Sequence, residues 1–193
     1  WELYRGVEFN IGAEASFFGM EIVDYSENLV SHRELIAQGV IDPLPENPPP
    51  PPEEGTSTIT DSRDSQVYKI VKIGNQWWMA KNLNYTSANS QCYENDPSNC
   101  DVYGRLYNFA TALTICPSGW HLPSDSEWKI LITNLGGTSV AGGKMKSTGT
   151  KYWMSPNTGA TNRSWFYGLP AGLRTNYSLD FSSIGKETYW WSS

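Results

Sequence analysis

The chain has 193 residues, of which 39% are hydrophobic and 13% aromatic, and its formal net charge at pH 7 is −6. The length suits one domain with an extension. The acidic balance argues against nucleic acid and anionic lipid as partners, because both need a basic face, and no apolar run approaches the roughly 20 residues of a transmembrane helix.

Residues 1–45 make a segment with few residues for an independent core. Residues 2–22 alternate patchily between apolar and polar side chains, as strands do, and residues 26–40 carry a helical apolar stripe that begins at a capping Ser26. We therefore expect this segment to dock on another protein or on the domain that follows.

A proline-rich linker is predicted over residues 46–59. Five consecutive prolines lie between acidic residues, and such runs adopt extended polyproline II without internal hydrogen bonds. The linker separates the N-terminal segment from the folded domain, which we place at residues 60–193.

A hairpin and a short helix are the first elements expected in the folded domain. Residues 67–83 contain two β-rich runs that meet at Gly74-Asn75, a pair that suits tight hairpin turns. Residues 103–113 predict a short amphipathic helix, because four apolar residues recur at helical spacing: Leu106, Phe109, Ala110 and Leu113.

The segment CYENDPSNC, residues 92–100, predicts a small closed loop. A disulfide between Cys92 and Cys100 would restrict the unfolded chain by ~2.5 kcal/mol. The oxygen-bearing side chains of the loop could hold Ca²⁺, but tight turns use the same residue types, and we favour the turn. Zinc is favoured still less, because the domain has three cysteines and one histidine without a CxxC pair. No cofactor is expected.

A second helix is predicted over residues 122–137. Ser124 and Glu127 have the spacing of a capping box, and a buried stripe follows, made of Trp128, Leu131 and Leu135. We interpret His121 as a packed or hydrogen-bonded side chain. The glycine-rich stretch 136–150 is interpreted as a surface loop, because it follows a helix and lacks the ending of a phosphate loop. No nucleophile motif is found, and we predict no catalytic site.

Aromatic runs in the last third admit two interpretations. They either build the core of a domain with few aliphatic residues or bind ligands by stacking. The first is favoured, and the candidates for the second are Trp153, Trp165 and Tyr167. Short strands and loops are expected from Tyr152 onward, which makes the domain α+β with two helices, hairpins and long loops.

From about Thr60 onward the chain resembles the Fibrobacter succinogenes major paralogous domain. Five pieces carry the resemblance in the right order: residues 61–85, 92–112, 116–131, 166–174 and the closing YWWSS. The resemblance implies a C-type-lectin-like fold and an exported protein, often a lipoprotein or surface protein of Bacteroidetes and Fibrobacteres, without an assigned activity. Family members usually continue past WWSS to a further cysteine, so a truncated match is expected, with the partner of Cys116 beyond Ser193.

These observations lead to a main functional hypothesis and two alternatives. We expect a non-enzymatic binding or assembly module on the bacterial surface, extracellular and associated with the outer membrane. The second hypothesis is a carbohydrate-binding adhesin whose aromatic loops stack on a glycan. An enzyme of the formylglycine-generating type is disfavoured, because the resemblance implies a late cysteine pair and none follows Cys116.

Overall fold

The computed structural model describes residues 55–175 and 180–193 of the chain. The predicted N-terminal segment 1–45 and most of the linker lie outside these residues. In chain order the described elements are β1 (Thr56–Thr60), β2 (Val67–Ile73), β3 (Gln76–Met79), β4 (Ser90–Gln91), η2 (Tyr93–Asn95), α2 (Pro97–Tyr103), β5 (Leu106–Tyr107), α3 (Phe109–Ala112), α4 (Asp125–Asn134), α5 (Thr138–Met145), β6 (Ala171–Arg174) and β7 (Phe181–Ile184).

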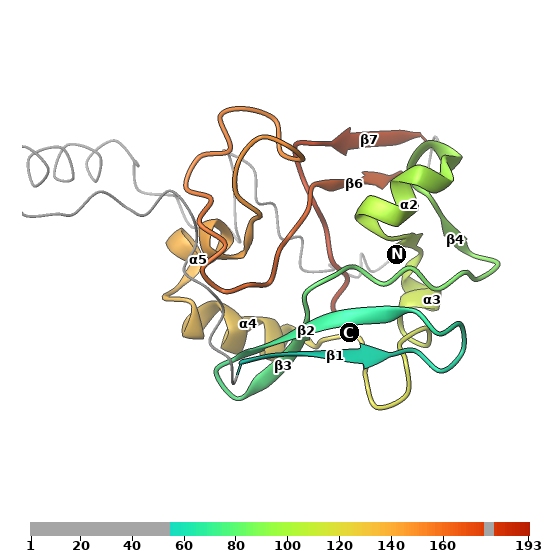
Figure 1. Cartoon of the computed structure of the whole chain (residues 1–193), viewed down its shortest axis with the longest axis horizontal. Helices are drawn as coiled ribbons and strands as arrows, with labels where there is room; N and C mark the ends of the chain where they lie inside the picture. The colour runs from blue at the N-terminus through green and yellow to red at the C-terminus, as the bar shows by residue number, and fades with distance from the viewer. Residues whose placement is uncertain (1–54, 176–179) are drawn as a thin grey trace, which may run out of the picture.

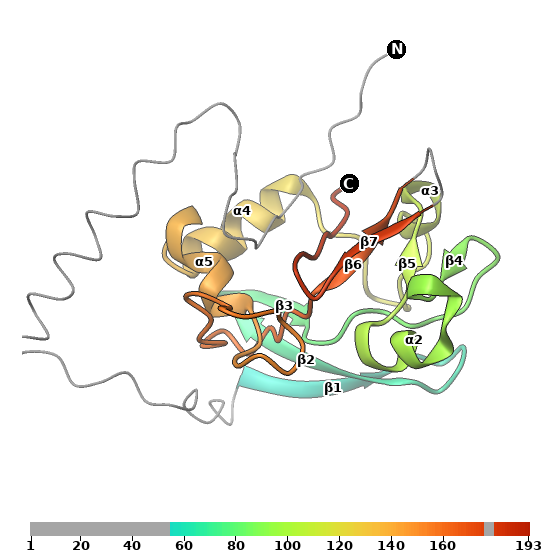
Figure 2. The same ribbon diagram turned by 90° about the horizontal axis from the view of Figure 1, so that it is seen from above.

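The elements form an α+β arrangement of three small antiparallel sheets with helices at both ends (Figure 1). The largest sheet has the order β1-β2-β3, and the other two are the pairs β4-β5 and β6-β7. Helices α4 and α5 lie at one end of the large sheet, whereas α2 and α3 lie at the other, as both views show (Figure 2).

The predicted hairpin over residues 67–83 is confirmed. Ile73 pairs with Gln76, so Gly74 and Asn75 make the two-residue turn, and Gly74 has the positive φ of 61° that this turn needs. Strand β1 pairs with β2 from Thr60 back to Thr56. The strand therefore begins within the range that we assigned to the linker.

Strand β2 is covered on both faces, which makes it the centre of the fold. The buried face switches along the strand: Tyr68 and Ile70 face one side, whereas Val71 and Ile73 face the other. Val71 and Ile73 join the main core with residues of β3, α4, α5 and the later loops, among them Trp78, Trp128, Leu131, Met145 and Phe166.

Helix α4 begins and packs as predicted. The Ser124 side chain accepts from the Glu127 N–H, and the Glu127 carboxylate accepts from the Ser124 N–H at 2.8 Å, which completes the capping box. The expected stripe is buried. Nε2 of His121 forms a hydrogen bond with the Glu127 carboxylate, 2.8 Å long, so this side chain reinforces the start of the helix.

The prediction of a surface loop over residues 136–150 is wrong, because α5 occupies most of that stretch. Its Ala141 and Met145 side chains are buried in the core. One of the glycines that suggested a loop serves close packing: a Cβ added at Gly143 would lie 2.3 Å from the Gly159 carbonyl oxygen.

The prediction of one helix over residues 103–113 is also wrong in part. Gly104, with φ of 77°, ends α2, and the next residues form strand β5 before Asn108 caps the short α3. Helix α2 begins inside the predicted turn, where the Asp96 side chain accepts from the Ser98 N–H. The described residues thus contain four α-helices instead of the two expected.

The aromatic runs of the last third close the core. Trp190 packs against Phe166 and Trp128, with ring centroids 5.4 and 5.9 Å away. Its Nε1 donates to Oδ1 of Asn82, whose Nδ2 donates to the carbonyl of Tyr103. One asparagine thus joins the end of the chain to the end of α2.

Candidate functional site

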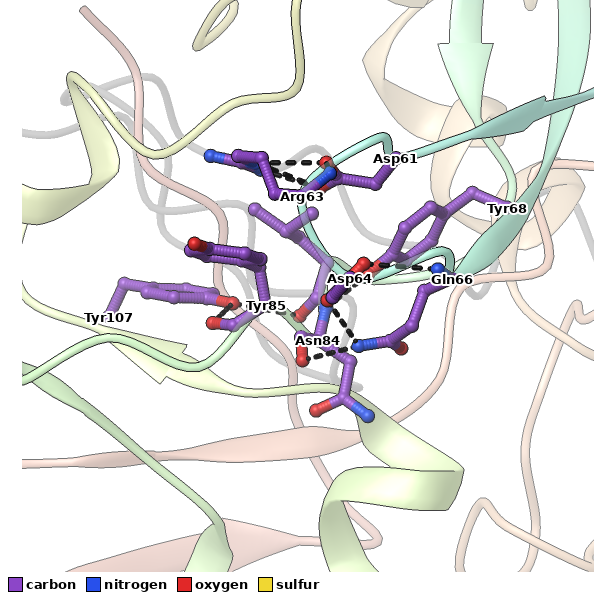
Figure 3. A network of polar contacts seen from close by, with 9 residues as sticks. Asp61, Arg63, Asp64, Gln66, Tyr68, Asn84, Tyr85 and Tyr107 are labelled. Carbon is purple, nitrogen blue, oxygen red and sulfur yellow. Dashed lines mark hydrogen bonds and ion pairs between the residues drawn. The ribbon is translucent and has the colours of Figure 1, made fainter.

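A buried ion pair anchors the turn between β1 and β2 (Figure 3). The Asp61 side chain is 1% exposed, and it accepts from Nε of Arg63 at 2.9 Å and from Nη2 at 2.6 Å. These hydrogen bonds hold the pKa of Asp61 below its usual value. The Arg63 guanidinium also lies over the Tyr85 ring, 3.9 Å from its centroid.

The same network ties this turn to the chain beyond the hairpin (Figure 3). Gln66 Nε2 donates both to Asp64 and to the Asn84 carbonyl, and the Tyr107 hydroxyl donates to the Tyr85 carbonyl at 2.7 Å. Burial raises the pKa of Tyr107. Apart from Oδ1 of Asn84, which is buried without a hydrogen-bond partner among the described residues, these polar groups are engaged with one another and with the backbone, so we interpret the network as a structural frame.

Cys116 lies close enough to Arg63 for its charge to favour the thiolate, but burial has the larger effect and raises the pKa of the thiol. A raised pKa leaves the thiol protonated at neutral pH, which does not suit a nucleophile.

Cys92 and Cys100 form the predicted disulfide, with an S–S distance of 2.02 Å, and Cys116 is the free cysteine of the described residues.

The loop 92–100 uses its oxygen atoms for local structure. Asp96 caps α2, and Asn99 Nδ2 donates to the Tyr93 carbonyl. In the described part of the chain, no three side chains of His, Cys, Asp or Glu come together as a potential group of metal ligands. The Ca²⁺ alternative stays a prediction.

The three aromatic candidates have different surroundings. Trp153 is 3% exposed and its Nε1 donates to the Gly168 carbonyl, so its ring belongs to the interior. Trp165 is partly buried against the core. Tyr167 is 43% exposed, and among the three it alone presents much of its side chain to solvent.

Tyr167 is displayed by a loop with an unusual backbone. Asn162, Trp165 and Tyr167 have φ values of 46°, 58° and 57°, in the left-handed region that bulky side chains avoid. The loop is held by the buried Asn162, whose Oδ1 accepts from the Tyr167 N–H at 3.0 Å, and by Ser164, which bonds to the Lys144 carbonyl. Strain of this kind collects at functional sites.

Tyr167 has polar and aromatic neighbours from two other parts of the chain. The Tyr103 ring, at the end of α2, meets the Tyr152 ring edge-on at 6.3 Å. Lys151 Nζ lies 5.0 Å from the Tyr152 centroid. A hydrogen bond with Tyr152 raises the pKa of Lys151, and the Coulombic effect of Tyr167 acts in the same direction. We call Tyr103, Lys151, Tyr152 and Tyr167 the tyrosine–lysine patch.

The sequence around the patch has an unusual charge distribution. Between Glu127 and Asp180 there is no acidic residue, although the chain as a whole has a net charge of −6. Six cations occupy that stretch: Lys129, Lys144, Lys146, Lys151, Arg163 and Arg174. The segment that supplies Lys151, Tyr152 and Tyr167 is therefore positively charged, unlike the chain as a whole.

Other lysines of this stretch are used within the fold. Lys129 pairs with Asp125, Lys144 donates to the Leu135 carbonyl, and the buried Lys146 donates to the Thr158 carbonyl. Lys151, by contrast, is exposed, and it forms no ion pair within the described residues. It is therefore available to a ligand.

Sequence reasoning identified one member of the patch, Tyr167, and missed the other three. Trp153 was the candidate from its aromatic run, whereas the exposed Lys151 and the Tyr152 that precede it belong to the patch. The acid-free stretch was a readable signal for a cationic surface. The contribution of Tyr103 had no such signal, because it depends on how α2 lies against a loop some 50 residues later.

None of the helices in residues 55–175 and 180–193 has the length and apolar character needed to cross a bilayer.

Comparison with known proteins bears on the family alone. Neither a curated protein nor a solved structure matches the chain. The family model described as the Fibrobacter succinogenes major domain matches residues 71–193, from the second half of β2 through the patch to the closing aromatic run. The chain therefore belongs to the Fibrobacter succinogenes major domain family.

Proposed function

We propose that this chain is a non-enzymatic binding or assembly module of the bacterial cell surface, built on a C-type-lectin-like fold. The observation that carries the proposal is the tyrosine–lysine patch, in which a strained loop holds the exposed Tyr167 and the exposed Lys151 lies over Tyr152 without an ion pair to any residue in 55–175 or 180–193. Such a surface suits recognition, because aromatic rings give contact area at low cost in side-chain entropy.

Several features support an extracellular, outer-membrane-associated location. The disulfide fits an oxidising compartment, and family membership agrees with the exported proteins that the motifs suggested. The proposal assigns residues 1–45 to docking on another surface protein, and the linker to spacing the domain away from it. The hydrogen bonds of Arg63 to Asp61 and the raised pKa of the buried Cys116 thiol favour structural over catalytic roles, which supports the non-enzymatic part of the proposal.

Binding to isolated bacterial envelopes tests the patch. The labelled full chain should show saturable retention, which the double variant Tyr152→Ala/Tyr167→Ala loses while its far-UV circular dichroism stays native. Trp77→Ala is the matched control, because Trp77 is also an exposed aromatic, 43% accessible, but lies on β3. Equal retention of all three proteins would contradict a role of the patch in binding.

A carbohydrate-binding adhesin is the second candidate, and the tyrosine faces favour it. Sugar rings carry an apolar C–H face that stacks on aromatic rings and hydroxyls that bond to groups at the ring edge. A glycan array probed with the full chain and the double variant separates the two candidates. Signals that depend on Tyr152 and Tyr167 support the adhesin, whereas a blank array with retained envelope binding favours assembly with a protein.

A further inference from the structure

We infer that the tyrosine–lysine patch binds acidic glycans, with the Lys151 ammonium pairing with a carboxylate of the sugar and the rings of Tyr152 and Tyr167 stacking on its C–H faces. This inference rests on the proposed function and names its ligand class.

Geometry places the cation where a substituent of a stacked sugar would lie. Lys151 Nζ is 5.0 Å from the Tyr152 centroid, so a sugar ring on Tyr152 has its edge near the ammonium. A carboxylate attached to a pyranose projects from that edge. The resulting hydrogen bond would be charge-assisted, which makes it stronger than a neutral one.

Charge argues for an anionic ligand. An exposed lysine beside tyrosines would serve a neutral sugar only as a hydrogen-bond donor. The stretch from Trp128 to Leu179 contains cations and no acid, in a chain that is otherwise strongly acidic. Repulsion of an acidic ligand is thus absent from the segment that supplies Lys151, Tyr152 and Tyr167.

Aromatic rings argue for a glycan over an acidic peptide or nucleic acid. Lys151 and Tyr103 both lie against Tyr152, and Tyr103 meets it edge-on, which leaves ring faces and hydroxyls as the main contact groups. Nucleic acids need several cations along a phosphate backbone, and the patch offers one. Peptides would be held mainly by backbone hydrogen bonds, for which the side chains of the patch offer one ammonium and the tyrosine hydroxyls.

Matched polysaccharides test this inference on the full chain. The panel is polygalacturonate, alginate, hyaluronan and polysialic acid, each with its carboxyl-reduced neutral form, and oligoglutamate as a peptide anion. We expect at least one acidic member to bind at least about fivefold more tightly than its neutral form, as one exposed ion pair of about 1 kcal/mol allows. Lys151→Gln should abolish that difference, and added salt should reduce it.

Lys129→Gln, on the exposed face of α4, should leave every affinity unchanged. Equal affinity for acidic and neutral forms, no effect of Lys151→Gln, equally tight binding of oligoglutamate, or no binding of any polysaccharide would each overturn the inference. Envelope binding that still depends on Tyr152 and Tyr167 would then leave the proposed function intact, whereas its loss would remove both.

Discussion

Asn162 and Tyr167 are joined by a hydrogen bond from the Tyr167 N–H to the Asn162 Oδ1, 3.0 Å long, across a loop in which both residues have positive φ. Asn162 is 2% exposed, whereas Tyr167 is 43% exposed. An interior asparagine thus fixes the backbone of a surface tyrosine. The position of the Tyr167 ring depends on this bond and on the left-handed backbone.

Replacement of Asn162 should therefore cost stability and loosen the loop. In Asn162→Ala the Tyr167 N–H loses its acceptor, and alanine tolerates positive φ less well than asparagine. We expect a loss of about 2 kcal/mol in the free energy of unfolding, measured with urea. Arg163→Ala, at the exposed neighbouring position, should stay within about 0.5 kcal/mol. Similar values for the two variants would show that the bond does not restrain the loop.

A glycine at position 167 should separate stability from binding. Tyr167→Gly relieves a backbone with φ of 57°, and we expect it to raise the free energy of unfolding by about 0.5 kcal/mol. Tyr167→Ala keeps the strain and should not stabilise. Both variants remove the ring and should weaken envelope binding alike. Destabilisation by glycine would mean that the ring contributes packing energy that outweighs the strain.

Gly172 is a position where any side chain should be damaging. Its φ is 66°, and an added Cβ would lie 2.4 Å from the Ser182 carbonyl oxygen and 2.7 Å from the Ile184 nitrogen, within the β6-β7 pair. We expect Gly172→Ala to cost about 3–4 kcal/mol in a urea titration. Gly119→Ala has a φ of 81° but nothing within 4 Å, so it should cost only about 1 kcal/mol. Equal costs would contradict the close approach of β7.

Acid should weaken the anchor of the β1-β2 turn. Because Arg63 lowers the pKa of Asp61 in the folded state, the pair stabilises fully above the unfolded pKa of about 3.9, and this contribution disappears as the pH falls through the lower folded pKa. Asp61→Asn should cost about 2 kcal/mol at neutral pH, and the difference from wild type should shrink below about pH 4.

The control for this pH dependence is Asp125→Asn, which removes the exposed pair with Lys129. An exposed pair contributes little, so this variant should follow wild type within about 0.5 kcal/mol at every pH. The measurement is urea unfolding repeated from acid to neutral pH. A difference between Asp61→Asn and wild type that stays constant down to the acid limit would contradict the assignment of the titration to Asp61.

Local chemistry made part of the fold predictable. The Gly74-Asn75 turn and the capping box at Ser124 and Glu127 are interactions between near neighbours, and the structure contains both. The disulfide followed from spacing in the same way. Helix α5 was missed because Gly142 and Gly143 lower helix propensity, while the close approach to Gly159 that demands one of them is a tertiary contact.

The site was less predictable than the fold, because it is assembled from distant segments. Tyr167 is exposed and Trp153 is buried, although both lie in similar aromatic runs. No periodicity distinguishes a ring that turns inward from one held outward by positive φ. The contact between Tyr103 and Tyr152 likewise depends on the tertiary placement of α2.

The aromatic core has a consequence for how this domain can be observed. Trp128 lies 4.7 Å from Trp78 and 5.9 Å from Trp190, centroid to centroid, so three indoles from three separate segments are near enough for their electronic transitions to couple. Such coupling gives the folded protein its own optical signature in the near ultraviolet. Because Trp190 belongs to the closing aromatic run and Trp78 to the β2-β3 hairpin, that signature reports the packing of these two segments without any added label.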